Sequence, residues 1–494
     1  MSTAHAMGVG ELLQGWIDPG TAGALQVRGL ALDSRRVADG DIFVALAGGL
    51  HAHGLAFARD AVAAGAVLVL AEPAPGVEAP QGLAAPVLWL DGLRGHLGAL
   101  AARFHGDPSR DLHVVGVTGT NGKTSTVQFL AQALEHVGLR SATIGTLGAG
   151  LHGALAPGEY TTPDAIGVQR LLAGFRGAGA SHVAMEVSSH ALAQGRVNAV
   201  RFELAAFTNL TRDHLDYHGS MERYGEAKRR LFGWPGLRGA AINLDDAFGR
   251  RLAGALDGVE CVGYGIASDD ATVRASALEA TPSGLSFDLV TPHGSGRVAT
   301  GLFGRFNVSN LLAVATCLGQ FGIGFEAIRS ALAAMRPVPG RMACIGGGDR
   351  PLVVVDYAHT PDALQQVLGT LRAHCVGALT CVFGCGGERD AGKRPQMGAI
   401  AEALADRIIV TDDNPRGEDG DAIVADIMAG LRRPDEAVVE RDRAGAISLA
   451  LARAGAGDVV LVAGKGHESS QEVDGMKYPF EDLAVARRVL EIGR

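Results

Sequence analysis

Short apolar runs alternate with amphipathic stretches throughout the last third of the chain. Four of these runs are typical of buried strands: Leu352–Val355, Leu379–Phe383, Arg407–Val410 and Val459–Val462. Stretches with helical periodicity follow the first three runs, and they begin near Pro361, Arg394 and Asp421. This rhythm predicts a largely parallel sheet that is covered by helices on both faces.

The first two thirds of the chain show the same alternation less regularly. Apolar runs predict strands at Asp41–Leu46, Ala66–Leu70 and His113–Val117, and a helical pattern covers Ser125–Val137. Turn-forming residues interrupt the pattern at Gly106–Ser109 and at Pro337–Gly340. We therefore predict an α/β protein with three domains, at residues 1–107, 108–338 and 339–494.

Composition narrows the class of protein. Of 494 residues, 47% are apolar and 20% are charged, which is enough for each domain to bury a core. The net charge of −9 argues against a broad nucleic-acid-binding face, because such a face needs clustered Lys and Arg. The six cysteines form no CxxC pair, so we expect free thiols in a reducing compartment. With no signal-peptide pattern and no apolar run of about 18 residues, we expect a cytoplasmic protein without membrane insertion.

The strongest chemical signal is a Gly-rich loop between a predicted strand and a predicted helix. Its glycines let backbone N–H groups turn toward phosphate oxygens, and the helix N-terminus favours negative charge. The usual first glycine of this pattern is replaced by Val117, and a chance Gly-Lys-Thr in an ordinary loop is the alternative. The residues expected to hold nucleotide phosphates are Gly119, Thr120, Asn121, Gly122, Lys123, Thr124 and Ser125.

Three further side chains are candidates for metal chemistry, each with an ordinary alternative. Glu186 ends an apolar run at 183–186 and could reach Mg²⁺, or it could pair with a neighbour. His214 could be a metal ligand or a hydrogen-bonded loop residue. Lys228 lies in the predicted helix Met221–Phe232, where composition alone predicts a solvated lysine.

Taken together, the motifs resemble the Mur ligase family of peptidoglycan synthesis. The shared segments are Gly119–Thr124, Met185–His190, Asp213–Gly219, Gly304–Asn310, Gly340–Met342 and Asp356–His359. The resemblance runs from about Leu32 to the last predicted strand. It implies a small α/β domain that binds UDP, a central P-loop ATPase-like domain with a parallel sheet, and a C-terminal Rossmann-like doubly wound domain that binds an amino acid.

The resemblance also implies roles for individual residues. Leu32 and Ser34 match UDP contacts, whereas His53–Leu55 departs from the Asp-Gly-His that is usual in the family and leaves the contacts around Gly49–His51 open. Matches to positions that hold the UDP-linked muramoyl dipeptide are Thr161, Thr162, Ser188, Gln194 and Arg196. Asn307 matches an adenine contact, and other ATP contacts are Arg341, Asp356 and His359. Lys228 matches a carbamylated lysine, so Thr124, Glu186, His214 and carbamylated Lys228 are the expected Mg²⁺ ligands, and Lys123, Lys228 and His214 are the expected catalytic residues.

Four polar motifs follow the predicted strands of the C-terminal domain, so we expect them to gather at one edge of the sheet. They are Asp356–His359, Gly384–Asp390, Asp412–Arg416 and Gly464–Glu468. The run Asp413-Asn414-Pro415-Arg416 resembles a diaminopimelate-recognition motif, and a surface salt bridge is the alternative role of Arg416. The expected diaminopimelate contacts are Arg389, Asp413, Asn414, Pro415, Arg416, Gly464 and Glu468.

The resemblance thus implies an ADP-forming ligase that adds meso-diaminopimelate to the UDP-linked muramoyl dipeptide, with ATP as co-substrate and Mg²⁺ as cofactor. All expected partners are small molecules, and a monomer is expected. Three alternatives stay open: the same ligase adding lysine, a folylpolyglutamate synthase, and a P-loop ATPase that acts as a switch. A lysine substrate has no distal carboxylate for Arg416, and the UDP-type motif counts against a folylpolyglutamate synthase.

Overall fold

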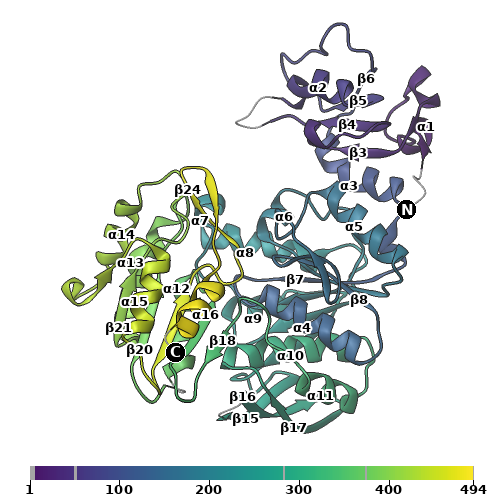
Figure 1. Cartoon of the computed structure of the whole chain (residues 1–494). Coiled ribbons are helices and arrows are strands. Elements are labelled where there is room, and N and C mark those ends of the chain that lie inside the picture. Colours follow the sequence, from purple (N-terminus) through teal and green to yellow (C-terminus); the bar gives the residue numbers. More distant parts are fainter. Residues whose placement is uncertain (1–5, 49–52, 282–283, 373–374, 493–494) are drawn as a thin grey trace. The chain divides into compact units, whose positions relative to one another are not determined.

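The structure is a computed structural model that describes residues 6–48, 53–281, 284–372 and 375–492 (Figure 1). The chain forms two compact units. The first unit comprises residues 1–115 and 140–203, and the second comprises residues 116–139 and 204–494. The contacts around Gly49–His51, which the sequence leaves open, lie outside the described residues.

The first unit opens with a parallel sheet in the order β3-β4-β5-β6. Its strands are β3 (Gly29–Ala31), β4 (Asp41–Ala45), β5 (Leu68–Ala71) and β6 (Val87–Trp89). The two faces of β4 and β5 belong to separate apolar clusters, one with α2 (Ala58–Ala63) and one with α1 (Val9–Leu12) and α3 (Leu93–Phe104). The predicted strands at 41–46 and 66–70 are confirmed, each with small shifts at its ends.

The rest of the first unit carries part of a second sheet. Strand β11 (His182–Glu186) pairs in parallel with β8 (Ser141–Gly145), and β9 (Gly148–Leu151) pairs antiparallel with β8 and with β10 (Ala154–Ala156). Helices α5 (Ala165–Gly177) and α6 (Ser189–Ala193) follow β10 and β11 in the sequence. Strand β7 (His113–Thr118) starts in this unit and leads into the phosphate loop.

The second unit begins with the predicted helix, α4 (Lys123–His136), directly after that loop. Parallel strands β12 (Phe202–Phe207), β13 (Gly239–Asn243) and β14 (Glu260–Gly265) are extended by β15 (Val273–Thr281), β16 (Gly284–Thr291) and β17 (Gly294–Thr300), and the last three pair antiparallel. Helices of this part are α7 (Leu215–His218), α8 (Met221–Arg229), α9 (Ala247–Gly254), α10 (Arg305–Gln320) and α11 (Phe325–Ala333).

The predicted helix Met221–Phe232 is wrong at its C-terminal end. Helix α8 stops at Arg229, and a 3-10 turn continues over Arg230–Gly233. Pro235 restricts the backbone before it, and glycine has low helical propensity, so the chain leaves the α-helix early.

The C-terminal part of the second unit is a sheet in the order β18-β19-β23-β20-β21-β22, in which all pairs except β18 with β19 are parallel. Its strands are β18 (Ala343–Gly346), β19 (Leu352–Asp356), β20 (Leu379–Phe383), β21 (Arg407–Val410), β22 (Val438–Val439) and β23 (Val459–Ala463). Apolar clusters cover both faces: α12 (Pro361–Arg372), α13 (Arg394–Leu404) and α14 (Gly420–Met428) supply one, and α15 (Arg443–Ala452) and α16 (Asp482–Ile492) the other. The prediction of a doubly wound sheet is confirmed. The four polar loops all leave the sheet at the carboxyl ends of its parallel strands.

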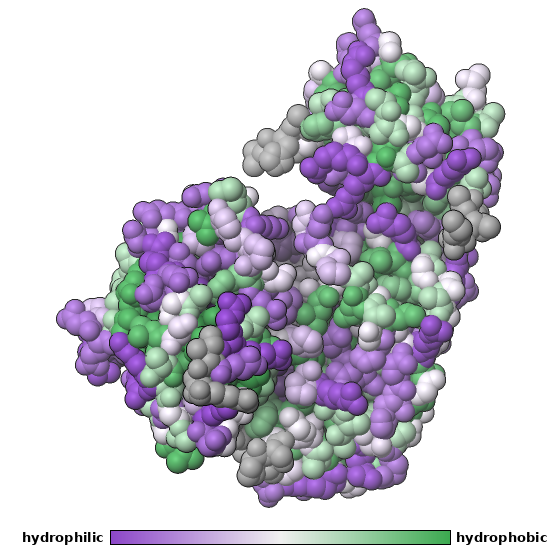
Figure 2. Space-filling view, viewed as in Figure 1, coloured by the Kyte–Doolittle hydropathy of each residue, from purple (hydrophilic) through white to green (hydrophobic). Residues whose placement is uncertain are grey.

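Two expectations from composition concern the thiols and the membrane. All six cysteines are free, and Cys317, Cys381 and Cys385 are buried. Among the described residues, no helix is both long enough and apolar enough to span a bilayer. On the face shown in Figure 2, hydrophilic and hydrophobic residues are interspersed.

Candidate active site

The phosphate loop is packed so tightly that two of its positions require glycine. Gly119 and Gly122 have positive φ angles of 149° and 84°. A Cβ at Gly119 would collide with the Thr208 hydroxyl, and one at Gly122 would collide with the Asn310 amide oxygen. Because L side chains disfavour such backbone angles as well, the loop needs both glycines for its shape.

Two lysines converge on one carbonyl of this loop. Lys123 Nζ donates to Gly119 O at 2.9 Å and to Thr120 O at 2.8 Å, and Lys228 Nζ donates to Gly119 O at 2.7 Å. Lys228 is fully buried, 4.3 Å from the centre of the Tyr224 ring, so it is not the solvated lysine that composition predicts. Burial and the charge of Lys123 lower the Lys228 pKa well below its usual value, against the opposing effect of Asp213. The amine is thereby biased toward its neutral form.

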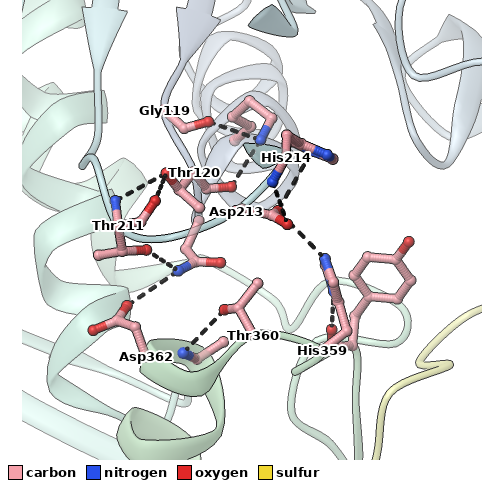
Figure 3. A network of polar contacts seen from close by, with 12 residues as sticks. Gly119, Thr120, Thr211, Asp213, His214, His359, Thr360 and Asp362 are labelled. Atoms are coloured by element: carbon pink, nitrogen blue, oxygen red, sulfur yellow. Dashed lines mark hydrogen bonds and ion pairs between the residues drawn. The ribbon is translucent and has the colours of Figure 1, made fainter. Parts of the chain in front are cut away.

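A buried carboxylate, Asp213, links the nucleotide loops to the β19 loop (Figure 3). Its Oδ2 lies 3.4 Å from His214 Nε2 and 3.9 Å from His359 Nε2. Burial raises the Asp213 pKa, but the hydrogen bond from His359 and the charges of both histidines and Lys393 outweigh it and lower the pKa. The imidazole of His214 therefore faces Asp213. Within the described residues, no group of three His, Cys, Asp or Glu side chains is arranged to hold a metal by itself.

A cavity of about 300 Å³ lies beside the phosphate loop. Asn121 lines it and donates from Nδ2 to Asp362 Oδ2 at 3.1 Å (Figure 3). Arg341, also in the lining, donates to the Thr124 hydroxyl at 3.1 Å and stacks 4.4 Å from the centre of the Tyr357 ring. The size of this cavity and its mixed apolar and polar lining suit a nucleotide.

The expected ATP contacts differ in their relation to this cavity. Gly122, Ser125 and Asp356 line it. Asp356 is buried, which raises its pKa against the opposing charge of Arg341, and it accepts a hydrogen bond from Met342 N at 2.7 Å. Asn307 lines a separate small cavity with Arg341. Asn310, one helical turn later, lines the cavity beside the phosphate loop.

The expected muramoyl-dipeptide contacts form one network in the first unit. Thr162 Oγ1 donates to Glu186 O at 2.7 Å and accepts from Ser188 N at 3.2 Å. Arg196 donates to Thr162 O at 2.9 Å and to Gln194 Oε1 at 2.8 Å. The structure therefore brings these positions together, although they are far apart in the sequence.

The network contains a residue that sequence reasoning missed. Thr146 follows β8 and donates from its backbone N to Glu186 Oε1 at 2.8 Å, while its hydroxyl lies 3.1 Å from that of Thr161. Its position after the carboxyl end of a strand was the only available signal. Glu186 lies in the first unit, at 1% exposure, and Thr146 holds its carboxylate.

The first unit has a cavity of its own, of about 670 Å³, and the expected UDP contacts line it. Leu32 and Ser34 line it together with Asp33 and Arg94. Hydrogen bonds from Arg35 to the Asp33 carboxylate lower the Asp33 pKa to about 2, so this carboxylate is charged at neutral pH. The pocket is formed by the loop after β3 and by residues of β4 and its following loop.

The loop after β21 presents Arg416 in a constrained conformation. Its φ is +56°, and its backbone is fixed by the hairpin of β24 (Ser470–Val473) and β25 (Met476–Pro479). Arg416 N donates to Glu472 O at 3.0 Å, and Arg416 O accepts from Asp474 N at 2.6 Å. The guanidinium donates to Gly387 O at 2.7 Å, which joins two of the four predicted loops.

The other expected diaminopimelate contacts lie on the same loops. Asn414 donates to Glu468 Oε2 at 2.8 Å, and Arg389 donates to the backbone O of its neighbour Glu388 at 2.9 Å. Asp413 is buried beneath Gly464, where a Cβ would collide with its carboxylate, and burial raises the Asp413 pKa. Asp413 is therefore a support of the loop in this conformation rather than an exposed acceptor.

Behind these loops lie a buried lysine and a buried ion pair that were not predicted. Lys465 lies between Asn414 and Glu468, and Arg443 pairs with Asp482 at 2.7 Å with both side chains fully buried. Arg443 also donates to Ala463 O at 3.0 Å, so the pair anchors the end of β23.

Comparison with known proteins agrees with this geometry. The Mur ligase middle domain matches residues 117–318, and the Mur ligase glutamate ligase domain matches residues 340–466. A relative from Xanthomonas campestris pv. campestris, named UDP-N-acetylmuramoyl-L-alanyl-D-glutamate--2,6-diaminopimelate ligase, is 55% identical over 99% of this chain and 98% of its own. A Pseudomonas aeruginosa relative of the same name is 52% identical over 94% of this chain and 95% of its own.

Solved structures lead to the same family. A structure titled with the same ligase name superposes with a TM-score of 0.70 and 37% identity over 99% of both chains. A Mycobacterium tuberculosis folylpolyglutamate synthase, 18% identical with a TM-score of 0.63 over 80% of this chain and 95% of its own, shares the fold alone. With two family models that match more than half of its residues, and relatives more than 50% identical along nearly all of its length, this chain belongs to the Mur ligase family.

Proposed function

We propose that this chain is the ligase that joins 2,6-diaminopimelate to UDP-N-acetylmuramoyl-L-alanyl-D-glutamate, at the expense of ATP, in peptidoglycan precursor synthesis. The observation that carries the proposal is the identity of 52–56%, over 94–99% of the chain, to relatives that bear this activity in their names. We assign residues 1–107 to UDP, 108–338 to ATP and 339–494 to the amino acid.

The choice of amino acid is supported by the charges of the β21 and β23 loops. Diaminopimelate has two amino-acid ends, so one end reacts while the distal carboxylate and ammonium need partners. The planar fork of Arg416 suits the carboxylate, and Glu468 suits the ammonium. Lysine has no distal carboxylate to pair with Arg416, whose guanidinium otherwise has only the Glu472 carboxylate at 3.9 Å among the described acidic side chains, so a lysine-adding ligase is not favoured.

The nucleotide is assigned to the cavity beside the phosphate loop. The N-terminus of α4 and the backbone of Gly119–Gly122 favour phosphate oxygens there. Lys123 Nζ, which is held by the carbonyls of Gly119 and Thr120, would exchange them for the β/γ-phosphates.

The donor set for Mg²⁺ fits if Lys228 is carbamylated. An ammonium cannot ligate a cation, and Mg²⁺ prefers oxygen to the nitrogen of a neutral amine. A neutral buried amine is, however, the form that takes up CO₂, and the resulting carbamate is an anion with two oxygen donors. Thr124 Oγ1 and this carbamate would then hold Mg²⁺ together with substrate phosphates, as this ion prefers oxygen ligands. When bound, Mg²⁺ supplies positive charge that stabilises the phosphoryl group during its transfer.

The reaction then proceeds in two steps. An oxygen of the D-glutamyl γ-carboxylate attacks the γ-phosphorus, the bond to ADP breaks, and an acyl phosphate forms. The neutral amine of diaminopimelate attacks the acyl carbon, phosphate leaves, and the amine loses a proton as the amide forms. Lys123 and the loop N–H groups stabilise the phosphoryl charge, so the protein acts chiefly by positioning and electrostatics.

A substrate-omission assay tests the proposal. Phosphate release by the purified chain is measured with ATP and Mg²⁺ while the UDP-dipeptide and the amino acid are left out in turn, and mass spectrometry identifies the product. We expect release only when both are present, with diaminopimelate strongly preferred over lysine. Release without an acceptor would instead indicate an ATPase switch. Preference for lysine would indicate the lysine-adding ligase, and use of a folate acceptor would indicate a folylpolyglutamate synthase.

A further inference from the structure

Lys465 is a fully buried lysine at the amino-acid end of the second unit. It follows Gly464 directly after β23, and its side chain has 0% exposure. Its Nζ donates to Asn414 Oδ1 at 2.8 Å and to Glu468 Oε2 at 2.8 Å. Because Asn414 Nδ2 donates to the same Glu468 Oε2 at 2.8 Å, the three side chains form a closed triangle.

The triangle divides the two oxygens of the Glu468 carboxylate. Oε2 accepts from both Lys465 and Asn414, whereas no side chain or backbone group in the described part of the chain donates to Oε1. The Glu468 side chain is 30% exposed while Lys465 is not exposed at all. Oε1 is therefore the oxygen left for a further donor, and the enclosed Lys465 binds the carboxylate at Oε2.

We propose that Lys465 is a positioning residue for the amino-acid substrate, which acts by holding Glu468 ionised and by turning Oε1 toward the substrate ammonium. Lys465 does not contact the substrate, because it is enclosed by the protein. The inference rests on the proposed function, since it takes Glu468 as an ammonium acceptor.

The electrostatic surroundings support this role. Burial raises the Glu468 pKa, and the charge and hydrogen bond of Lys465 are the largest opposing effects, so that the net direction is downward. Asn414 and His467 add smaller lowering effects. Removing the lysine charge would leave a buried carboxylate that takes up a proton more readily, and a protonated Glu468 binds an ammonium poorly.

Other groups face the carboxylate from neighbouring elements. Asp413 of the β21 loop, Tyr357 of the β19 loop and Arg443 of α15 all interact electrostatically with Glu468. The Arg443 charge is already paired with Asp482, and Asp413 has the same sign as Glu468. Lys465 is thus the cation that bonds directly to Glu468.

A purely stabilising role does not explain this arrangement well. Replacing a buried ion pair with apolar residues is often neutral or stabilising, so stability alone is weak grounds for a buried lysine. Both acceptors of Lys465 lie among the expected diaminopimelate contacts, which indicates a role in the site.

The test is a double-mutant cycle with Lys465→Met and Glu468→Gln, assayed by phosphate release across pH. At neutral pH, Lys465→Met should raise the KM for the amino acid about 10- to 100-fold, as expected for loss of a charged hydrogen bond, while the KM values for ATP and UDP-dipeptide change less than about twofold. Because the Glu468 pKa rises, the acid limb of kcat/KM for the amino acid should move to higher pH and activity should recover there.

The remaining variants separate positioning from structure. Glu468→Gln should lose affinity at every pH, and the double variant should be no worse than Glu468→Gln alone, since Lys465 acts through Glu468. Additive losses, an unmoved acid limb, or a parallel rise in all three KM values would overturn the proposal. Lys465→Gln, which keeps donors without charge, carries the same test if Lys465→Met fails to fold.

Failure of the proposed function is recognised separately with the wild-type enzyme. If the wild type joins lysine rather than diaminopimelate, that function is wrong, but the side-chain ammonium of lysine lets the same cycle decide the role of Lys465. If it joins an amino acid without a second ammonium and the cycle shows no coupling, both are wrong.

Discussion

Replacing Arg416 separates the proposed role of this residue in substrate recognition from the strain of its backbone. Arg416→Ala removes the guanidinium, its 2.7 Å bond to Gly387 O and its 3.9 Å ion pair with Glu472, but leaves an L-residue at φ +56°. Arg416→Gly removes the same side chain and also relieves the backbone. The pairing of residue 416 with Glu472 O and Asp474 N uses backbone atoms alone, so both variants keep the loop in place.

The expected magnitudes follow from these contacts. A charge-assisted pair with the distal carboxylate of diaminopimelate is worth about 2–4 kcal/mol, which corresponds to a loss of roughly 30- to 1000-fold in kcat/KM for either variant. A non-glycine residue in the left-handed region costs about 1–2 kcal/mol, and the extra chain entropy of glycine offsets about 0.5–1 kcal/mol of the gain. Arg416→Gly should therefore be as inactive as Arg416→Ala but more stable, by up to about 1.5 kcal/mol.

Two measurements and one control decide the matter. Phosphate release gives kcat/KM for diaminopimelate and for lysine, and urea unfolding gives the stability of each variant. Arg416→Lys keeps the charge without the fork, so we expect its activity to lie between those of the wild type and Arg416→Ala. Unchanged use of diaminopimelate by Arg416→Ala would refute the recognition role, and a less stable Arg416→Gly would refute the strain argument.

Three other changes have defined outcomes. Gly119→Ala places a Cβ against the Thr208 hydroxyl, so the KM for ATP should rise at least about tenfold, and unchanged nucleotide affinity in a titration would contradict the tight packing. Asp482→Ala leaves Arg443 buried without its partner and should cost about 3–5 kcal/mol in urea unfolding, where a loss below about 1 kcal/mol would count against it. With ¹³C-labelled bicarbonate, NMR should detect a carbamate that is absent from Lys228→Met, and a wild type without this signal would exclude the modification.

The hydrophobic pattern was sufficient for the C-terminal sheet because its central strands β19, β20 and β23 are buried on both faces. Strands β20 and β21 have the bounds that their apolar runs predict. The antiparallel extension β15–β17 carried no comparable signal, since exposed residues alternate along much of β17 and glycine recurs there. Sequence periodicity thus succeeds where burial is two-sided and weakens at a sheet edge.

The site shows a different limit, which lies in the nature of its contacts. Motif resemblance and strand ends together brought the Gly464–Glu468 and Asp412–Arg416 loops to one edge, because a parallel sheet dictates where loops gather. Whether Lys465 within such a motif is exposed or enclosed depends on Asn414, which is 51 positions away and contributes one oxygen atom. Likewise, the low pKa of Lys228 results from burial and from Lys123 across the phosphate loop, whereas its own helix is rich in charge. The burial that shifts the pKa values of these charged groups therefore depends on the fold, so the sequence pattern alone does not identify them.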